Sequence, residues 1–328
     1  MTPSPSARRL REMLRTAFGD AINAALNDPL VIEILVNPDG TVWLDRAGEG
    51  RVVTDVVLPP ADRERIVRLV ASHVAVEVHA EAPIVSAELP TFLPDRRGER
   101  FEGLLPPVVE GACFAIRKPA SRVFTLGDYV SDGMLSSVQA RLLRSAVQDR
   151  RNILIAGGTS SGKTTFANAL LAEVAALNDR VVLIEDTREL QCAARDVVAL
   201  RTRAGVASLS DLVRSTLRLR PDRIIVGEVR GGEALELLKA WNTGHPGGVA
   251  TLHANSAIGA LYRLEQLIQE AVVHVPRRLI ADAVDVVVFI QNHNPFTRTP
   301  RRVEAVMALD GLIAEGDYRL RPLEAAET

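Results

Sequence analysis

GGTSSGKTT, residues 157–165, decides the fold of this chain, because its glycines, lysine and threonine match the phosphate-loop pattern G-x-x-x-x-G-K-[ST]. The run RNILIAG before it is typical of a short buried strand, and TTFANALLAEVAAL after it has the apolar spacing of a helix. A strand, a loop and a helix in this order are the context that the motif requires. The stretch therefore predicts a nucleoside triphosphate site in an α/β fold.

The residue types of this loop suit a chain of phosphates. Glycines let the backbone turn its N–H groups inward, and the following helix points its positive end at the same phosphates. Lys163 can reach the β- and γ-phosphate oxygens, and the Thr164 hydroxyl is placed to bind Mg²⁺. Thr165 is either a further phosphate contact or simply a residue of the first helical turn. We expect ATP contacts from the whole loop: Gly157, Gly158, Thr159, Ser160, Ser161, Gly162, Lys163, Thr164 and Thr165.

Length and composition limit the class of protein. With 328 residues the chain is long enough for two domains, each with its own core. Its net charge of −2 gives no sign of bulk nucleic-acid binding. Cys113 and Cys192 are the only cysteines, which excludes a four-cysteine zinc module and a disulfide framework. The start MTPSPSARRL lacks a secretory signal, and no stretch approaches the roughly 18 apolar residues that span a bilayer. We expect a cytoplasmic protein whose membrane contact is at most peripheral.

The first part of the chain has the pattern of a small α+β domain. Short apolar or alternating runs are separated by turns, and Asp39-Gly40 is a strong hairpin signal. One helix, at about 61–72, interrupts the strands. The predicted strand regions are 31–45, 51–57, 74–80, 84–89 and 112–119. We place this domain at residues 1–118 and a polar, turn-rich linker at 119–132.

Residues 133–328 have the pattern of an open α/β NTPase core. After a helix at 136–150, nearly continuous apolar strands alternate with amphipathic helices. This alternation implies a parallel sheet covered on both faces. The strands are expected at 152–157, 180–187, 223–229, 248–254 and 285–291, and the helices between them at 164–174, 211–218, 232–241 and 260–271.

An amphipathic helix is expected at residues 8–27. Leu10, Met13, Leu14, Phe18, Ile22 and Leu26 recur at helical spacing, with arginines between them. We favour packing of this apolar stripe on its own domain or on a neighbouring subunit. A position on a membrane surface is the alternative.

Acidic residues follow two of the predicted strands of the NTPase core. Glu228 is the last but one residue of the run RIIVGEV, where a phosphate-loop enzyme needs an acid near Mg²⁺ and the γ-phosphate. Glu185 and Asp186 end the run VVLIED, at the edge where open α/β sheets place their ligands. Glu185 is either the group that polarises the attacking water or a solvated loop carboxylate, and the strand alone does not separate the two.

Two histidines stand in TGHPGGVATLHANS, residues 243–256. His253 ends a predicted strand and is expected beside the phosphate loop, where it can sense the γ-phosphate or carry coupling. His245 precedes a proline and either shapes a turn or takes part in the site. A zinc site made by both would need a third ligand, which the sequence does not offer at metal-type spacing.

Together, GGTSSGKTT, LIEDTREL, RPDRIIVGEVRGGEA and TGHPGGVATLHANS resemble the four ordered boxes of the secretion ATPase superfamily. Its members power type II and type IV secretion, type IV pili and conjugation. Within it, the ARRLREMLR start and the segment GERFEGLLPPVVEGACFAIRKP resemble the TrbB-type conjugal transfer ATPases of type IV secretion systems. The resemblance covers essentially the whole chain.

The resemblance implies a homohexameric ATPase at the inner membrane, whose partners are inner-membrane components of the secretion system. It implies an N-terminal domain that closes over ATP held, with Mg²⁺, by a RecA-like C-terminal domain. In this frame Glu185 is the water-activating base, and Glu228 is the acid of an atypical Walker B motif that supports Mg²⁺. Lys163 and Thr164 bind phosphate in the loop, and His253 belongs to the histidine box. Arg230 bridges the Walker B strand to nucleotide or to a neighbour. Arg100 and Arg117 reach the phosphates from the N-terminal domain, although Arg96 and Arg97 stand close to Arg100.

Three other interpretations compete. The first is another motor of the same superfamily. Type II secretion ATPases typically carry a four-cysteine zinc insertion and pilus retraction motors end in a helical motif, and neither feature is found in this sequence. A RecA-like nucleic-acid motor is the second, because arginines recur at 201, 203, 214, 218, 220 and 223, so direct DNA contact stays open. The third is a nucleotide-gated scaffold with negligible turnover. A hydrolysis assay with and without DNA separates these three.

Overall fold

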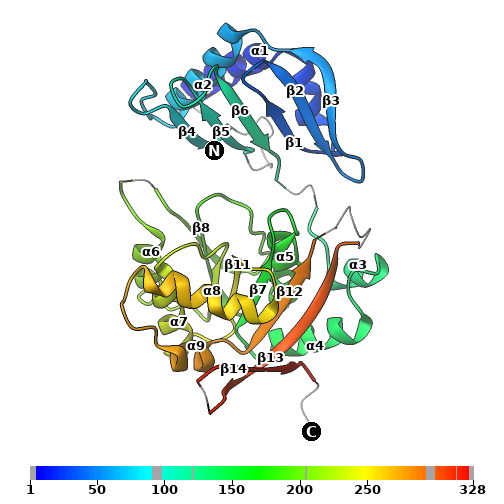
Figure 1. Ribbon diagram of the computed structural model, residues 1–328, viewed down its shortest axis with the longest axis vertical. Helices are drawn as coiled ribbons and strands as arrows, with labels where there is room; N and C mark the ends of the chain where they lie inside the picture. The colour runs from blue at the N-terminus through cyan, green and yellow to red at the C-terminus, as the bar shows by residue number, and fades with distance from the viewer. Residues whose placement is uncertain are drawn as a thin grey trace. The chain divides into compact units, whose positions relative to one another are not determined.

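The chain divides into two units, Met1–Ser121 and Arg122–Thr328, which are called the N-terminal and C-terminal units below (Figure 1). The computed structural model describes residues 5–90, 98–119, 122–203, 205–292, 300–314 and 316–324. Among the described residues, no helix is both long and apolar enough to cross a membrane.

The N-terminal unit is a six-stranded antiparallel sheet with two helices packed on one face. The strands are ordered β3 (Gly50–Val57), β2 (Thr41–Arg46), β1 (Val31–Val36), β6 (Cys113–Arg117), β5 (Arg100–Leu104) and β4 (Ile84–Glu88). Helices α1 (Pro5–Asn27) and α2 (Pro60–His73) share one buried cluster with alternate strand residues, such as Ile34, Phe101 and Ile116. Because strand side chains alternate between faces, both helices cover the same face of the sheet.

The hairpin predicted at Asp39-Gly40 joins β1 to β2, and Gly40 has a φ of 92°, which suits glycine. The strand predicted at 74–80 is wrong. Ala75 has a left-handed φ of 56°, and the Val76 N–H bonds back to the Ala71 carbonyl, so this segment caps the end of α2. The strand β5 was not predicted, and it lies between β6 and the edge strand β4.

The apolar stripe of α1 packs in the core of its own unit. Leu14, Phe18 and Ile22 are buried there. The helix is interrupted at Gly19, which has a φ of 67°, and the Asn23 side chain donates to the Arg15 and Gly19 carbonyls across the break. The packing on its own domain that we favoured for this helix is therefore what the structure shows.

The C-terminal unit is an eight-stranded sheet covered on both faces. Its order is β14 (Tyr318–Pro322), β13 (Arg302–Leu312), β12 (Val286–Gln291), β7 (Ile153–Gly157), β11 (Val249–His253), β10 (Arg223–Val226), β8 (Arg180–Glu185) and β9 (Asp196–Arg201). The strands from β12 to β9 are parallel, and β13 and β14 continue the sheet antiparallel. The mixed α/β fold class predicted from the sequence is confirmed.

Helices cover both faces of this sheet, and each face has its own cluster of buried hydrophobic side chains. One cluster holds α3 (Leu126–Ser131), α4 (Ser137–Gln148) and α5 (Lys163–Val174). The other holds α6 (Leu209–Thr216), α7 (Glu233–Asn242), α8 (Ala257–Gln269) and α9 (Arg277–Ala283). The strands β9, β13 and β14 and the helix α9 were not predicted.

Part of the segment that we placed in a linker, 119–132, is the helix α3. A reciprocal capping box between Thr125 and Asp128 begins it, and Leu126 and Tyr129 are buried in the C-terminal unit. The Tyr129 ring stands edge-on to Phe166 of α5, with centroids 5.1 Å apart. Two buried side chains and a cap hold this short polar-looking segment as a helix.

Candidate active site

The phosphate loop joins β7 to α5 and is shaped by its glycines. Gly162 precedes α5 with a φ of 90°, and Ser160 also has a left-handed φ, of 58°. A Cβ added to Gly157 would stand 2.6 Å from Ser161 Oγ and 2.7 Å from the Ile290 carbonyl oxygen. Only glycine therefore fits at the start of this loop.

Two polar side chains inside the loop are suited to a phosphate. Lys163 is only 7% exposed. Its ammonium donates hydrogen bonds to two carbonyl oxygens of its own loop, at 3.1 Å to Gly157 and 2.9 Å to Gly158. The Ser161 hydroxyl is buried and has no hydrogen-bond partner among the described residues. A buried ammonium, an unsatisfied hydroxyl and the positive end of α5 fit an anionic group.

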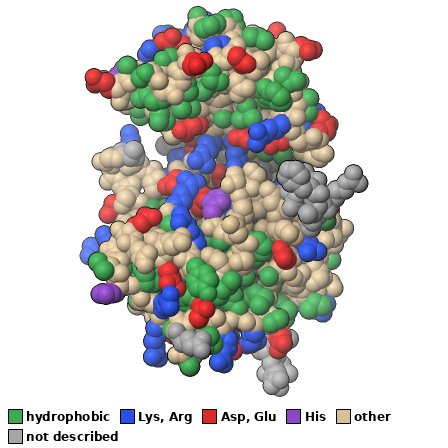
Figure 2. Space-filling model, in the orientation of Figure 1, with side chains coloured by type: hydrophobic (Ala, Val, Ile, Leu, Met, Phe, Trp, Pro, Cys, Tyr) green, Lys and Arg blue, Asp and Glu red, His purple; other side chains and the backbone are tan. Residues whose placement is uncertain are grey.

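A histidine and a glutamate lie directly beside this lysine. In the β11–β7 ladder His253 is paired with Gly157, and both of its ring nitrogens lie 3.4–3.5 Å from Lys163 Nζ. His253 Nε2 is 2.8 Å from Glu228 Oε1. Figure 2 shows basic, acidic and histidine side chains gathered together on this side of the larger unit. The carboxyl ends of neighbouring parallel strands bring these residues to one edge of the sheet.

The charges of this cluster fix its protonation. Burial raises the pKa of Glu228, but the Arg230 hydrogen bond and the charges of Arg230, His253 and Lys163 outweigh it, so the pKa is lowered overall. Burial lowers the pKa of His253, and the Lys163 charge lowers it further. At neutral pH, Glu228 is therefore a carboxylate beside a neutral imidazole.

Arg230 links the two acidic segments of the site. Its guanidinium contacts Glu228 Oε2 at 2.5 Å, and the other terminal nitrogen lies 3.7 Å from Asp186 Oδ2. Asp186 Oδ1 in turn accepts a hydrogen bond from the Thr202 hydroxyl at 2.7 Å. A continuous series of side-chain contacts therefore runs from Lys163 through His253, Glu228, Arg230 and Asp186 to Thr202, which directly follows β9.

Glu185 has different surroundings. Its side chain is only 4% exposed, and Oε1 accepts hydrogen bonds from the Glu189 N–H at 2.8 Å and the Leu190 N–H at 2.6 Å. Gly227 packs against it, since a Cβ there would stand 3.2 Å from Glu185 Cγ. The solvated-carboxylate alternative is therefore wrong, because this carboxylate is buried and orders the loop that follows β8.

Comparison with known proteins identifies the family. Residues 19–307 match the model of the family described as "Type II/IV secretion system protein". The chain belongs to this family. It is 48% identical to the conjugal transfer protein TrbB of Rhizobium radiobacter, over 95% of this chain and 94% of that protein. It is 32% identical to the type IV secretion system protein VirB11 of Bartonella quintana, over 77% of this chain and 80% of that protein. The resemblance to TrbB-type proteins is confirmed.

A solved structure shares the fold of this secretion-family chain. The pilus retraction motor PilT with bound ADP aligns with a TM-score of 0.62 at 19% identity, over 93% of this chain and 82% of that chain. At this identity the likeness supports the architecture of a smaller unit followed by an α/β core, and nothing about specificity.

Among the other expected site residues, Thr164 and Thr165 lie partly buried in the first turn of α5. Arg100 and Arg117 lie in the N-terminal unit, where they are directly opposite each other in the β5–β6 ladder. His245 is not at the site. It lies before β11, at the opposite edge of the sheet from His253, with Nδ1 2.9 Å from the Pro221 carbonyl oxygen, and shapes a turn.

Two expectations about metals and nucleic acid can be refined. No group of three or more His, Cys, Asp or Glu side chains is arranged as a metal site in the described parts of the chain. Arg223, which we grouped with the DNA-facing arginines, is 1% exposed and forms a buried ion pair with Asp179 at 2.6 Å. It is a structural residue, and its buried position follows from the apolar strand in which it stands.

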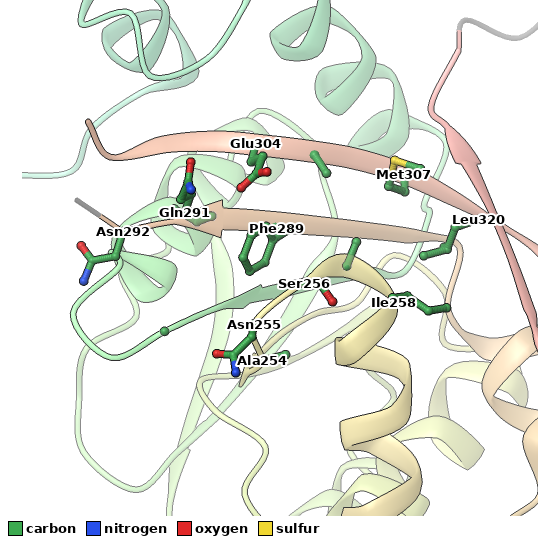
Figure 3. Close-up of a pocket in the computed structure, with 14 residues that line it drawn as sticks. Ala254, Asn255, Ser256, Ile258, Phe289, Gln291, Asn292, Glu304, Met307 and Leu320 are labelled. Atoms are coloured by element: carbon green, nitrogen blue, oxygen red, sulfur yellow. The ribbon is translucent and has the colours of Figure 1, made fainter. Parts of the chain in front are cut away.

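A hollow of about 720 Å³ lies beside the loop (Figure 3). Its wall is formed by Phe289 and Gln291 of β12, Asn255 and Ser256 before α8, and the neighbouring strand β13, and it touches the phosphate loop at Gly158. Lys163, Glu228 and His253 do not line it. The hollow is therefore next to the phosphate site without being part of it.

Sequence reasoning missed two residues that donate hydrogen bonds to backbone carbonyls of the loop. The Asn292 side-chain amide donates to the Thr159 carbonyl and the Arg301 guanidinium to the Ser160 carbonyl, both at 3.1 Å. They stand at the end of β12 and just before β13. No motif marks them, because the contact depends on β12 lying next to β7 in the sheet.

Proposed function

We propose that this member of the secretion family hydrolyses ATP with Mg²⁺ to power conjugal transfer through a type IV secretion system. The observation that carries this proposal is the continuous set of contacts from Lys163 through His253 to Glu228 at the mouth of a phosphate loop. The name of the Rhizobium radiobacter relative, conjugal transfer protein TrbB, supports the biological setting.

The loop residues bind and orient the triphosphate. Phosphate oxygens replace the Gly157 and Gly158 carbonyls as partners of the Lys163 ammonium, which already points into the loop. The backbone N–H groups at the start of α5 and the Ser161 hydroxyl supply further donors. Lys163 then leaves His253, so nucleotide binding changes the charge that His253 and Glu228 experience.

Mg²⁺, when bound, neutralises charge that develops on the β- and γ-phosphates. Thr164 is the first-turn hydroxyl that would hold it, and Glu228, a carboxylate at neutral pH, would hold it directly or through water. We assign Glu185 as the base that orients and deprotonates the attacking water. Its two backbone hydrogen bonds fix its position at the carboxyl end of β8, one strand from Glu228.

Arg100 and Arg117 are assigned to the phosphates as cations from the N-terminal unit. Their direct pairing across β5 and β6 supports a joint action, because cross-strand neighbours project from the same face. Arg230 is assigned as a structural residue whose guanidinium bridges the carboxylates of Glu228 and Asp186.

The assembly that we propose is a homohexamer in the cytoplasm, peripheral at the inner membrane and docked on membrane components of the secretion system. The exposed arginines Arg8, Arg9 and Arg15 of α1 suit an acidic partner or an anionic membrane surface. A pilus or type II secretion motor is the alternative within the same family, and direct DNA contact stays open.

The test is ATP hydrolysis by the wild-type chain and by Lys163→Ala, each with and without DNA. The wild type should hydrolyse ATP, and Lys163→Ala should lose hydrolysis with an unchanged melting temperature, because the lysine neutralises phosphate charge and its ammonium donates to carbonyls of the loop itself. Wild-type turnover in Lys163→Ala would contradict the phosphate-loop assignment. Turnover that requires DNA would favour the nucleic-acid motor, and no turnover in the wild type would favour a nucleotide-gated scaffold.

A further inference from the structure

Arg301 places a cation against the phosphate loop from outside the motif. Its guanidinium donates to the Ser160 carbonyl at 3.1 Å. It also lies over the start of α5, since a Cβ added to Gly162 would stand 3.6 Å from Arg301 Nη1. The side chain is exposed, and no carboxylate among the described residues pairs with it.

This position is electrostatically unfavourable unless an anion binds. The N-terminus of α5 is the positive end of its helix dipole, and α5 has neither a side-chain cap nor an acidic residue in its first turn. Lys163, the first residue of α5, adds a full positive charge. A second cation without a carboxylate partner among the described residues adds no stability here, because like charges repel.

The buried hydroxyl of Ser161 points to the same ligand. Ser161 is 1% exposed, and its oxygen has no partner among the described residues. Ser160, which accepts the bond from Arg301, is the residue directly before it. An unsatisfied donor inside the loop and an unpaired guanidinium beside it are both satisfied by one polyphosphate.

We propose that Arg301 is a further phosphate-binding residue, which supplies a second cation of the C-terminal unit to the nucleotide held by the loop. This inference rests on the proposed nucleotide function and adds a residue that the phosphate-loop motif does not contain. The guanidinium needs only a side-chain rotation to exchange the Ser160 carbonyl for a phosphate oxygen, because it already lies beside Gly162. Arg301 would then bind phosphates from the β13 side of the loop.

The competing explanation is that Arg301 only holds the loop in shape through the Ser160 carbonyl. Arg301→Gln separates the two, because glutamine keeps an N–H donor for that carbonyl and removes the charge. Arg301→Lys keeps the charge. Arg302→Gln is the matched control, since Arg302 is the next residue, is exposed and pairs with Gln291 in the β12–β13 ladder.

The experiment measures the dissociation constants of ADP and of inorganic pyrophosphate for the full-length wild type and the three variants, with melting temperature as the fold check. We expect Arg301→Gln to weaken both ligands about tenfold or more, the scale of a lost charge-assisted hydrogen bond. Arg301→Lys should stay within a few-fold of the wild type, and Arg302→Gln should match it.

Wild-type affinity for pyrophosphate in Arg301→Gln would overturn the inference. An equal loss of affinity in Arg302→Gln would also overturn it, because it would indicate a general effect of net charge. If Arg301→Gln has a lower melting temperature than the wild type, the affinities of Arg301→Lys and Arg302→Gln for pyrophosphate are compared instead. A tenfold loss of affinity in Arg301→Lys would then reject a charge contact between Arg301 and the phosphates. Lys163→Ala distinguishes this failure from failure of the proposed function. If Lys163→Ala loses pyrophosphate binding while Arg301→Gln does not, only the role of Arg301 is rejected.

Discussion

The two glutamates of the site are held by different kinds of partner. Glu185 accepts hydrogen bonds from the backbone of the loop after β8, whereas Glu228 is bound by the side chains of His253 and Arg230. Backbone N–H groups hold a carboxylate in place, while side chains such as His253 and Arg230 can rearrange when Lys163 turns to a phosphate. This difference suits a fixed base at Glu185 and a nucleotide-responsive acid at Glu228.

Glu185→Gln should retain tight ATP·Mg²⁺ binding and lose turnover by about 10²-fold or more, the scale of general base catalysis. Glu228→Gln should also lose turnover and in addition require a higher magnesium concentration, because it weakens the support of the ion. ATP affinity, a magnesium titration and the single-turnover rate measure these effects.

Glutamine has nearly the shape of glutamate, so both variants should remain folded and assembled. If Glu185→Gln hydrolyses ATP normally and Glu228→Gln alone is inactive, the base is Glu228. A lower melting temperature in Glu185→Gln would show that the bonds to Glu189 and Leu190 matter chiefly for stability.

At the scale of elements, one row of charged residues crosses the sheet of the N-terminal unit. Successive strand pairings place Glu88 opposite Arg100, Arg100 opposite Arg117, Arg117 opposite Glu33, Glu33 opposite Asp45, and Asp45 opposite Arg51. Arg100 and Arg117 are the only direct neighbours of like positive charge in this row of described residues. Opposed like charges destabilise a sheet, so an anion bound by both arginines would relieve this repulsion.

Arg100→Ala and Arg117→Ala should each lower ATP turnover, by up to roughly 10³-fold if the arginine stabilises charge on the transferred phosphoryl group. Neither should change the melting temperature much, because each variant removes the repulsion between the two arginines together with the attraction to one glutamate, Glu88 for Arg100 and Glu33 for Arg117. Steady-state hydrolysis and calorimetry measure the two effects.

Arg51→Ala is the control for these variants, because Arg51 stands in the same row on the edge strand β3. An equal loss in Arg51→Ala would mean that turnover depends on the net charge of the unit. Unchanged kinetics in both Arg100→Ala and Arg117→Ala would make them ordinary surface residues.

For the whole molecule, the fold should depend on no bound metal, whereas activity should depend on magnesium. The described residues bring no three metal-ligand side chains together, and the two cysteines lie in different units. A zinc-selective chelator should therefore change neither the melting temperature nor hydrolysis. EDTA should stop hydrolysis, and added Mg²⁺ should restore it.

Unfolding by the zinc-selective chelator would reveal a structural metal. Hydrolysis that survives EDTA would contradict the assignment of Thr164 and Glu228 to Mg²⁺. The melting temperature in EDTA without nucleotide is the control, and it should equal that of the untreated chain.

The sequence by itself determined the phosphate loop, the alternating core and the family. These features are local: the loop is nine consecutive residues, and each strand or helix of the core is marked by its own apolar spacing. His253 was placed beside the loop for the same reason, since it ends a strand of a parallel sheet.

Only the tertiary structure decided which distant residues touch the loop and which carboxylate is buried. Arg301 stands 141 positions from Ser160, and their contact depends on the strand order around β7. The strand β5 is set by its neighbours β4 and β6, and the short helix α3 by burial of Leu126 and Tyr129, so local spacing is a weak guide to both. The burial of Glu185 likewise depends on Gly227, which the adjacent strand brings against it.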